Sequence, residues 1–266
     1  MKKWRNIGVC LRGLCAVLLV LLGAVACKPD AMQSEMCLRF TFTFEGESLR
    51  MGERTYGIAS GERIAVSDIR YFVSDVVLVD YAGRRVKFEE DNRNVHYVSS
   101  DLEESLTWRS SRKLPTGVYD YVEFVYGLDS ARNVSHAFRN PPESLMFWPE
   151  VLGGGYHYMQ INGYWGDAGE TACTRPFGLH TGIGTEQGEE GSVHFSNAVK
   201  IIDTLRFFLV EDGDKTLTVN MEVAEWFRNP HEWRFSQYGG SVMQNPEAQR
   251  VLRDNAASVF EVRESG

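Results

Sequence analysis

Histidine is the residue type of this chain best suited to bind a metal ion. The six copies are His96, His136, His157, His180, His194 and His231. No two of them form an HxH or HxxxH pair, so a metal site would have to join imidazoles from distant strands. Imidazole nitrogen suits copper and zinc, and methionine thioether is added when copper is reduced. Met146, Met159 and Met243 are available to supply that sulfur.

Two histidines stand out by their position. His180 ends a short expected strand, residues 176–180, and precedes a glycine-rich connection, so it should lie near a rim where loops gather. His96 lies between apolar neighbours on another short expected strand, residues 95–98, and should be half-buried. A histidine in such a setting is more often a hydrogen-bonded core or rim residue than a ligand, and Trp148 is more often a core anchor than a reactive group. Both interpretations stay open for these residues.

Catalytic motifs are missing from the chain. It contains no GxSxG, P-loop, GxGxxG or HExxH sequence. Glu222 and Glu225 lie close together in sequence, but a glycosidase pair is recognised by the spatial separation of its carboxylates, which a sequence does not provide. We therefore expect a protein that is not an enzyme.

The elements that must position these side chains are mostly strands. Leu38, Phe40 and Phe42 alternate with polar residues, and Leu217, Val219 and Met221 share a face in the same way. One helix is expected near the end, with Asn245 as its N-cap, Pro246 as its first residue and residues 247–257 following. This pattern predicts an all-β fold, an antiparallel β-sandwich of about ten strands with one C-terminal helix.

A long central excursion, residues 124–165, interrupts the strand pattern. It contains two adjacent prolines, the run Met146-Phe147-Trp148 and a triple glycine. Phe138, Met146 and Trp148 make it too apolar for a disordered segment, so we expect it to pack across one end of the sandwich.

The first residues indicate where the protein resides. Four basic residues and a short apolar stretch precede Ala26-Cys27, which resembles a bacterial lipoprotein cleavage site. We expect residues 1–26 to be a lipoprotein signal peptide, Cys27 to be lipidated, residues 27–35 to form a tether and residues 36–266 to form a single domain. The protein would then be lipid-anchored and extracytoplasmic, at the outer membrane or cell surface. An ordinary signal with a chance cysteine is the alternative.

The net charge bears on which partners the protein can bind, and the cysteine content bears on whether it forms a disulfide. Removal of residues 1–26 takes away four positive charges and no negative ones, which moves the formal net charge from -8 to -12. So acidic a chain is unsuited to a phosphate backbone, and we expect no nucleic-acid binding. Cys37 and Cys173 remain in a compartment that permits disulfides, either as one bridge or as two separate thiols.

Several short motifs, taken in order, resemble one known family. They are IRYFVSDV at 69–76, YGLD at 126–129 with Asn133, MFW at 146–148 before Gly155 and Tyr156, FGLH at 177–180 and VAEWF at 223–227. Together they resemble the MbnP-like family of bacterial copper-binding proteins, in the version common in Bacteroidetes lipoproteins. The match spans essentially the whole mature chain.

The resemblance implies a β-sandwich that binds copper. In some relatives it also implies a site tryptophan oxidised to kynurenine by a dihaem partner enzyme of the MauG type. His180, His96 and Trp148 fall on family positions, with Met146 beside them, whereas His136 and His157 fall where the family pattern requires none. The better-studied branch has histidine directly after the asparagine that corresponds to Asn133, and it carries paired cysteines.

The sequence therefore leaves two possible functions of different kinds. The first is a lipid-anchored protein for copper acquisition or handling, with His180, His96, Met146 and Trp148 at its metal site. The alternative is a surface-exposed module that binds a glycan or a protein through aromatic side chains. Tyr156, Tyr158, Tyr164, Trp165, Trp226 and Trp233 are the aromatics on which this alternative depends.

Overall fold

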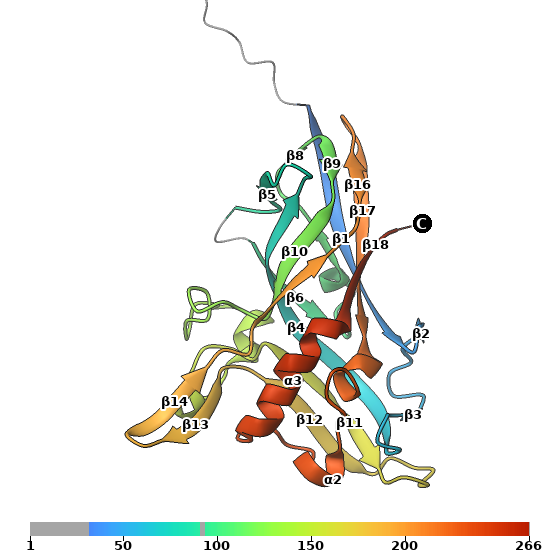
Figure 1. Ribbon diagram of the computed structural model, residues 1–266, viewed down its shortest axis with the longest axis vertical. Helices are drawn as coiled ribbons and strands as arrows, with labels where there is room; N and C mark the ends of the chain where they lie inside the picture. Colours follow the sequence, from blue (N-terminus) through green and yellow to red (C-terminus); the bar gives the residue numbers. More distant parts are fainter. Residues whose placement is uncertain (1–31, 91–93, 266) are drawn as a thin grey trace, which may run out of the picture. The chain divides into compact units, whose positions relative to one another are not determined.

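Two β-sheets dominate the computed structural model, which describes residues 32–90 and 94–265 (Figure 1). The first has the order β18-β17-β1-β2, with β7 and β8 also pairing with β1. Its strands are β1 (Gln33–Phe44), β2 (Glu47–Ser48), β7 (Thr107–Arg109), β8 (Leu114–Pro115), β17 (Asp214–Glu222) and β18 (Phe260–Glu264).

The second sheet is organised around the long strand β4. Its order is β12-β11-β4-β10-β15, and β3, β5 and β6 also pair with β4. Its strands are β3 (Tyr56–Gly57), β4 (Arg63–Val79), β5 (Arg85–Lys87), β6 (Val95–Ser99), β10 (Tyr121–Tyr126), β11 (Met159–Gly166), β12 (Arg175–Thr181) and β15 (Val199–Asp203).

Smaller elements complete the fold. Two pairs of strands stand apart from the main sheets: β13 (Gly184–Gly188) with β14 (Gly191–Phe195), and β9 (Gly117–Tyr119) with β16 (Phe207–Leu209). The helices of the described residues are η2 (Glu103–Leu106), η3 (Glu143–Met146), η4 (Glu150–Leu152), η5 (Val223–Phe227), α2 (Phe235–Tyr238) and α3 (Pro246–Val259).

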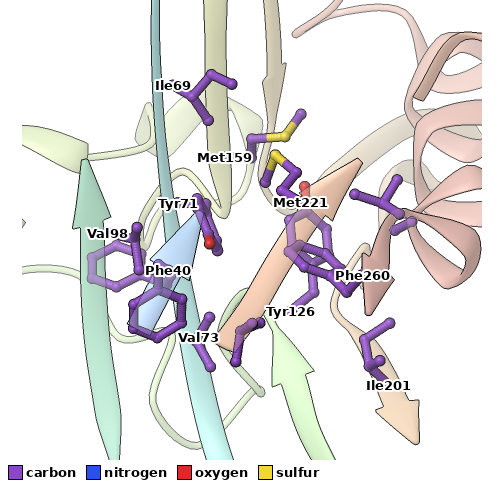
Figure 2. Packing of buried hydrophobic residues seen from close by; sticks show 14 of the residues in the cluster. Phe40, Ile69, Tyr71, Val73, Val98, Tyr126, Met159, Ile201, Met221 and Phe260 are labelled. Atoms are coloured by element: carbon purple, nitrogen blue, oxygen red, sulfur yellow. The ribbon is translucent and has the colours of Figure 1, made fainter. Parts of the chain in front are cut away.

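The hydrophobic core lies between the two sheets (Figure 2). Phe40 of β1 meets Tyr71 of β4 edge to face, with ring centroids 6.3 Å apart. Tyr71 also contacts Phe260 of β18 at 5.7 Å, and Met159 and Met221 pack in the same region. Rings that reach from one sheet to the other are what the alternating strands predicted, and the predicted β-sandwich is confirmed.

One pairing departs from an antiparallel arrangement. β1 runs parallel to β17 along nine register positions, from Glu35 with Asp214 to Thr43 with Glu222. The two strands lie 179 residues apart in sequence, as at Thr41 and Asn220, so no hairpin sets their relative direction. The alternating hydrophobic pattern of each strand buries the same face whether the two strands run parallel or antiparallel.

The predicted helix is confirmed as α3. Asn245 Oδ1 accepts from Ala248 N at 3.0 Å, and Pro246 occupies the first turn, where its missing N–H costs nothing. Leu252 and Val259 on its inner face are fully buried.

The N-terminal predictions lie outside the described residues, Cys27 and most of the tether included. The described residues from Gln33 onward form one compact unit. In the described part of the chain, no helix is long and apolar enough to cross a membrane. Cys37 and Cys173 are separate free thiols, and Cys37 is buried.

Candidate metal centre

His180 lies on the face of β12 opposite to Phe177 and Leu179, which point into the core. Its Nε2 is 2.8 Å from Asn162 Oδ1 on the neighbouring strand β11. Asn162 Nδ2 in turn donates to Asp68 Oδ1 at 3.0 Å, which orients the amide with its oxygen toward the histidine. Because an amide oxygen only accepts, His180 carries its proton on Nε2 and keeps a lone pair on Nδ1.

His157 lies just before β11, where the central excursion rejoins the sheet. Its backbone N donates to the Met146 carbonyl at 2.6 Å, and its Nδ1 lies 3.0 Å from the same oxygen. This carbonyl fixes the proton on Nδ1, so the lone pair is on Nε2. His157 Nε2 is buried and has no hydrogen-bond partner among the described residues. A buried imidazole nitrogen with no partner is costly unless a ligand satisfies it.

The two imidazoles meet beside Trp148. The ring centroids of His157 and His180 are 5.2 Å apart at an interplanar angle of 83°, and those of His157 and Trp148 are 4.8 Å apart at 80°. Trp148 is fully buried but lies outside the main hydrophobic cluster. The structure therefore gathers two imidazoles and one indole where the excursion reaches the end of β12.

Glycine makes room for the indole. A Cβ at Gly182 would lie 2.5 Å from Cδ2 of Trp148, closer than any real contact, so the ring rests directly on the backbone there. The indole Nε1 donates to the Leu152 carbonyl at 3.1 Å, and Thr185 Oγ1 donates to the same oxygen at 2.7 Å. The position of Trp148 is thus fixed from both ends of the ring.

Burial keeps both imidazoles neutral at pH 7. Desolvation lowers the pKa of His180 to about 4, and the neighbouring His157 and Arg70 act in the same direction. Desolvation also lowers the pKa of His157, against the opposing hydrogen bond to the Met146 carbonyl. A neutral imidazole is the form that binds a metal ion.

A buried network of amides supports the backbone at His180. Gln249 of α3 donates through Nε2 to the His180 carbonyl at 2.6 Å and to the Val242 carbonyl at 3.2 Å. Asn197 Nδ2 donates to Gln249 Oε1 at 2.8 Å and to the Gly182 carbonyl at 2.9 Å. One network therefore holds the end of β12, the glycine under Trp148 and the segment before α3.

The donor set fits a soft, low-coordinate ion. Among residues 32–90 and 94–265, no group of three His, Cys, Asp or Glu side chains is arranged to hold a metal ion. Two imidazoles alone fall short of the three or four protein ligands that zinc sites use. Copper accepts imidazole in combination with thioether sulfur, and the unpartnered His157 Nε2 is a ready donor.

His96 is not brought to this centre. Its ring is stacked between Phe40 at 5.4 Å and Trp108 at 5.0 Å, and its Nε2 lies 2.8 Å from the Ser105 carbonyl. Strands β4 and β11 lie between β6, which carries His96, and β12, which carries His180. Three inter-strand spacings amount to roughly 14 Å, too far for both imidazoles to bind one ion.

Met146 contacts His157 through its backbone, whereas Trp148 contacts it through its side chain. The Met146 side chain is buried in the main hydrophobic cluster, and the backbone carbonyl is the group that contacts His157. Trp148 contacts the imidazole of His157 directly. Met146 therefore contributes a carbonyl oxygen that orients the imidazole of His157.

Sequence reasoning missed His157. Its place at the start of a strand in an expected excursion carries no metal-ligand spacing. The pairing of β11 with β12 could have indicated that His157 lies near His180. These strands are antiparallel, and Gln160 is paired with His180. Three residues before Gln160, the chain must pass close to the end of β12, and His157 is the residue at that point.

The aromatics required by the alternative function are mostly inside the protein. Tyr156, Tyr158, Trp165, Trp226 and Trp233 are all buried, and Tyr164 alone of that set is exposed, at 48%. A single exposed tyrosine does not form an aromatic binding platform.

Comparison with known proteins agrees with this fold. A family model described as MbnP matches residues 33–244. The solved structure of MbnP from Methylosinus trichosporium is similar, with a TM-score of 0.56 at 14% sequence identity, covering 88% of this chain and 99% of that one. None of the curated proteins compared with the chain matches it. The family match extends over most of the chain, and the chain belongs to the MbnP family.

Proposed function

We propose that the protein binds copper outside the cytoplasm and serves in copper acquisition or handling, with the ion held between His157 and His180 beside Trp148. Membership of the MbnP family is consistent with a copper-related function. The observation that carries the proposal is the buried His157 Nε2, which has no hydrogen-bond partner among the described residues and belongs to a ring 5.2 Å from that of His180.

The residues of this chain act by orientation and by exclusion of water. The Met146 carbonyl and the Asn162 amide oxygen each hold one imidazole proton, so His157 Nε2 and His180 Nδ1 offer their lone pairs. Trp148 covers the site as a fully buried wall. Copper, when bound, is the cargo, and no covalent chemistry by the chain itself is required.

Two further parts of the proposal concern the setting. A lipid chain on Cys27 would hold the protein at the outer membrane or cell surface, where copper enters the cell envelope. A dihaem partner enzyme of the MauG type would oxidise Trp148 to kynurenine. The contact between Trp148 and His157 supports this second part, because a modified side chain at that place adjoins the ligand.

Copper content tests the proposal. The purified protein is loaded with Cu(I) under reducing conditions, separated from free metal and analysed for copper per chain. The parent should hold one copper ion, and His157→Gln and His180→Gln should each lower affinity more than about a hundredfold, since loss of an outer-sphere partner alone costs 10–100-fold.

His231→Gln is the matched control, because that histidine is exposed and its ring contacts Asp254 instead of the groups around Trp148. A parent without copper, or a His157→Gln His180→Gln double variant that retains it, would overturn the proposal.

A further inference from the structure

A cavity of about 470 Å³ opens beside His180. One wall is β12, including Phe177, Gly178 and His180, and the other is the segment that leads into α3, including Ser241 and Met243. Gly178 N donates to the Gly240 carbonyl at 2.7 Å, and Gly178 forms a parallel bridge with Ser241. The two walls are therefore joined by backbone hydrogen bonds and have a defined separation.

Gly178 leaves His180 accessible from this cavity. The two residues lie on the same face of β12, because successive strand residues alternate in direction. A Cβ at position 178 would lie 3.0 Å from His180 Nε2 and 3.4 Å from Asn162 Oδ1. A side chain here would crowd the Nε2–Cδ2 edge of the imidazole, the edge that donates to Asn162. Glycine leaves that edge uncovered, so the ring of His180 lines the cavity.

Met243 faces the same cavity and is half-buried. Val242 directly precedes Met243 in the chain. Gln249 donates to the carbonyl of Val242 and to the carbonyl of His180. One buried side chain thus fixes both the strand that carries the imidazole and the segment that carries the thioether. Thioether sulfur is a soft donor that selects Cu(I).

We propose that this cavity is the entry route for Cu(I) and that the Met243 thioether binds the ion first and passes it to His180. The inference rests on the proposed function and adds a transient ligand to it. The transfer is a ligand exchange: the copper–sulfur bond breaks as a copper–nitrogen bond forms, and copper remains Cu(I). No proton leaves His180, because its Nδ1 already carries a lone pair.

Loading kinetics test the route. Reduced protein is mixed with the Cu(I)–bicinchoninate complex, and transfer is followed in a stopped-flow spectrometer by the loss of the coloured complex. Met243→Leu keeps the apolar volume and removes the sulfur, so the fold is retained. It should load on the order of tenfold more slowly than the parent while reaching the same final copper content.

Met51→Leu is the control, because Met51 is also half-buried but packs against the core away from this cavity. It should load at the parental rate. Parental loading by Met243→Leu would overturn the route. Loss of copper at equilibrium in Met243→Leu would also overturn it, because Met243 would then be a permanent ligand.

The route and the proposed function can fail separately. If His180→Gln abolishes copper binding and Met243→Leu loads at full speed, the site stands and the route is wrong. If the parent takes no copper from the complex and binds none from free Cu(I), the proposed function is wrong and the route is wrong with it.

Discussion

At the scale of single residues, the proposed function depends on which nitrogen of each imidazole carries the proton. The Met146 carbonyl and the Asn162 amide oxygen make that choice for His157 and His180. His157 Nε2 is left buried without a partner, an arrangement that a folded protein tolerates where a ligand satisfies the atom. In the proposed site, Met146 and Asn162 therefore orient the two imidazoles that would bind the metal.

Asn162→Ala tests this positioning role. Without the amide oxygen, His180 is free to rotate and to place its proton on either nitrogen, so Cu(I) affinity should fall about 10–100-fold while stoichiometry is retained. Competition titration against a Cu(I) chelator measures the change. Asn140→Ala, at an exposed position, is the control, and an unchanged affinity in Asn162→Ala would show that the amide does not orient the ligand.

The depressed pKa of His180 predicts how the metal-free protein responds to acid. In the folded chain the pKa is about 4, against 6.5 for the ordinary value, so between these pH values the unfolded chain binds a proton that the folded chain does not. Stability should therefore be fully present above pH 6.5 and fall as the pH drops toward 4, by about 3 kcal/mol.

Urea unfolding of the metal-free protein at pH 7.5 and at pH 4.5 measures this loss. His180→Gln lacks the titrating group and should lose less over the same interval. An equal loss in the parent and in the variant would mean that other groups, His157 among them, account for the acid sensitivity.

At the scale of elements, a helix and a strand pair hold the centre together. Gln249 of α3 is fully buried and links the carbonyls of His180 and Val242, and Asn197 joins it to Gly182. The excursion contributes Trp148 and His157, which lie over the end of β12. The site thus depends on four segments of the chain: the excursion, the end of β12, Asn197, and α3 with the residues before it.

Gln249→Ala should destabilise the protein by about 2 kcal/mol or more, because it leaves buried carbonyl and amide groups without partners at about 1–3 kcal/mol each. Chemical unfolding measures the change. Gln237→Ala, at an exposed position of α2, should stay within about 0.5 kcal/mol of the parent. Equal effects from the two substitutions would contradict the assigned role of the network.

Gly182→Ala tests whether the Trp148 ring needs glycine beneath it. The added Cβ would meet the Trp148 ring at 2.5 Å, so the ring must shift, at a cost of about 1–3 kcal/mol. Gly57→Ala is the matched control, because a Cβ at that position meets no atom within 4 Å. Near-ultraviolet circular dichroism and thermal unfolding should change in the first variant and not in the second.

Much at this scale could be predicted from sequence. Alternation in β1 and β17 identified strands, and the Asn245-Pro246 pair identified α3, because these signals are local. The parallel pairing of β1 with β17 and the approach of His157 to His180 depend on distant contacts. His180 was found because it ends a strand beside loops, whereas His157 gains its role only when the excursion folds back.

At the scale of the whole molecule, the sandwich carries the centre on its outside. The core between the sheets is filled by apolar side chains. His180 lies on the other face of β12, and the ring of His157 packs against it. A metal site outside the core can be loaded from the surface without disturbing the packing between the sheets. This placement suits a protein that receives and hands on an ion.

The proposed lipid anchor at Cys27 would determine where the whole protein resides. Cys27→Ala should release the protein from the membrane fraction into the soluble fraction when it is expressed in a Gram-negative host, since the acyl chains supply the membrane affinity. Cell fractionation and immunoblotting measure it. Copper content per chain should be unchanged, and membrane retention of the variant would contradict the anchor.

The position of copper in a crystal of the Cu(I)-loaded protein tests the central claim most directly. An anomalous difference map recorded at the copper absorption edge should show one peak at about 2 Å, the length of a metal–imidazole bond, from both His157 Nε2 and His180 Nδ1. A peak at His96, or a fully loaded crystal with no peak between His157 and His180, would contradict it.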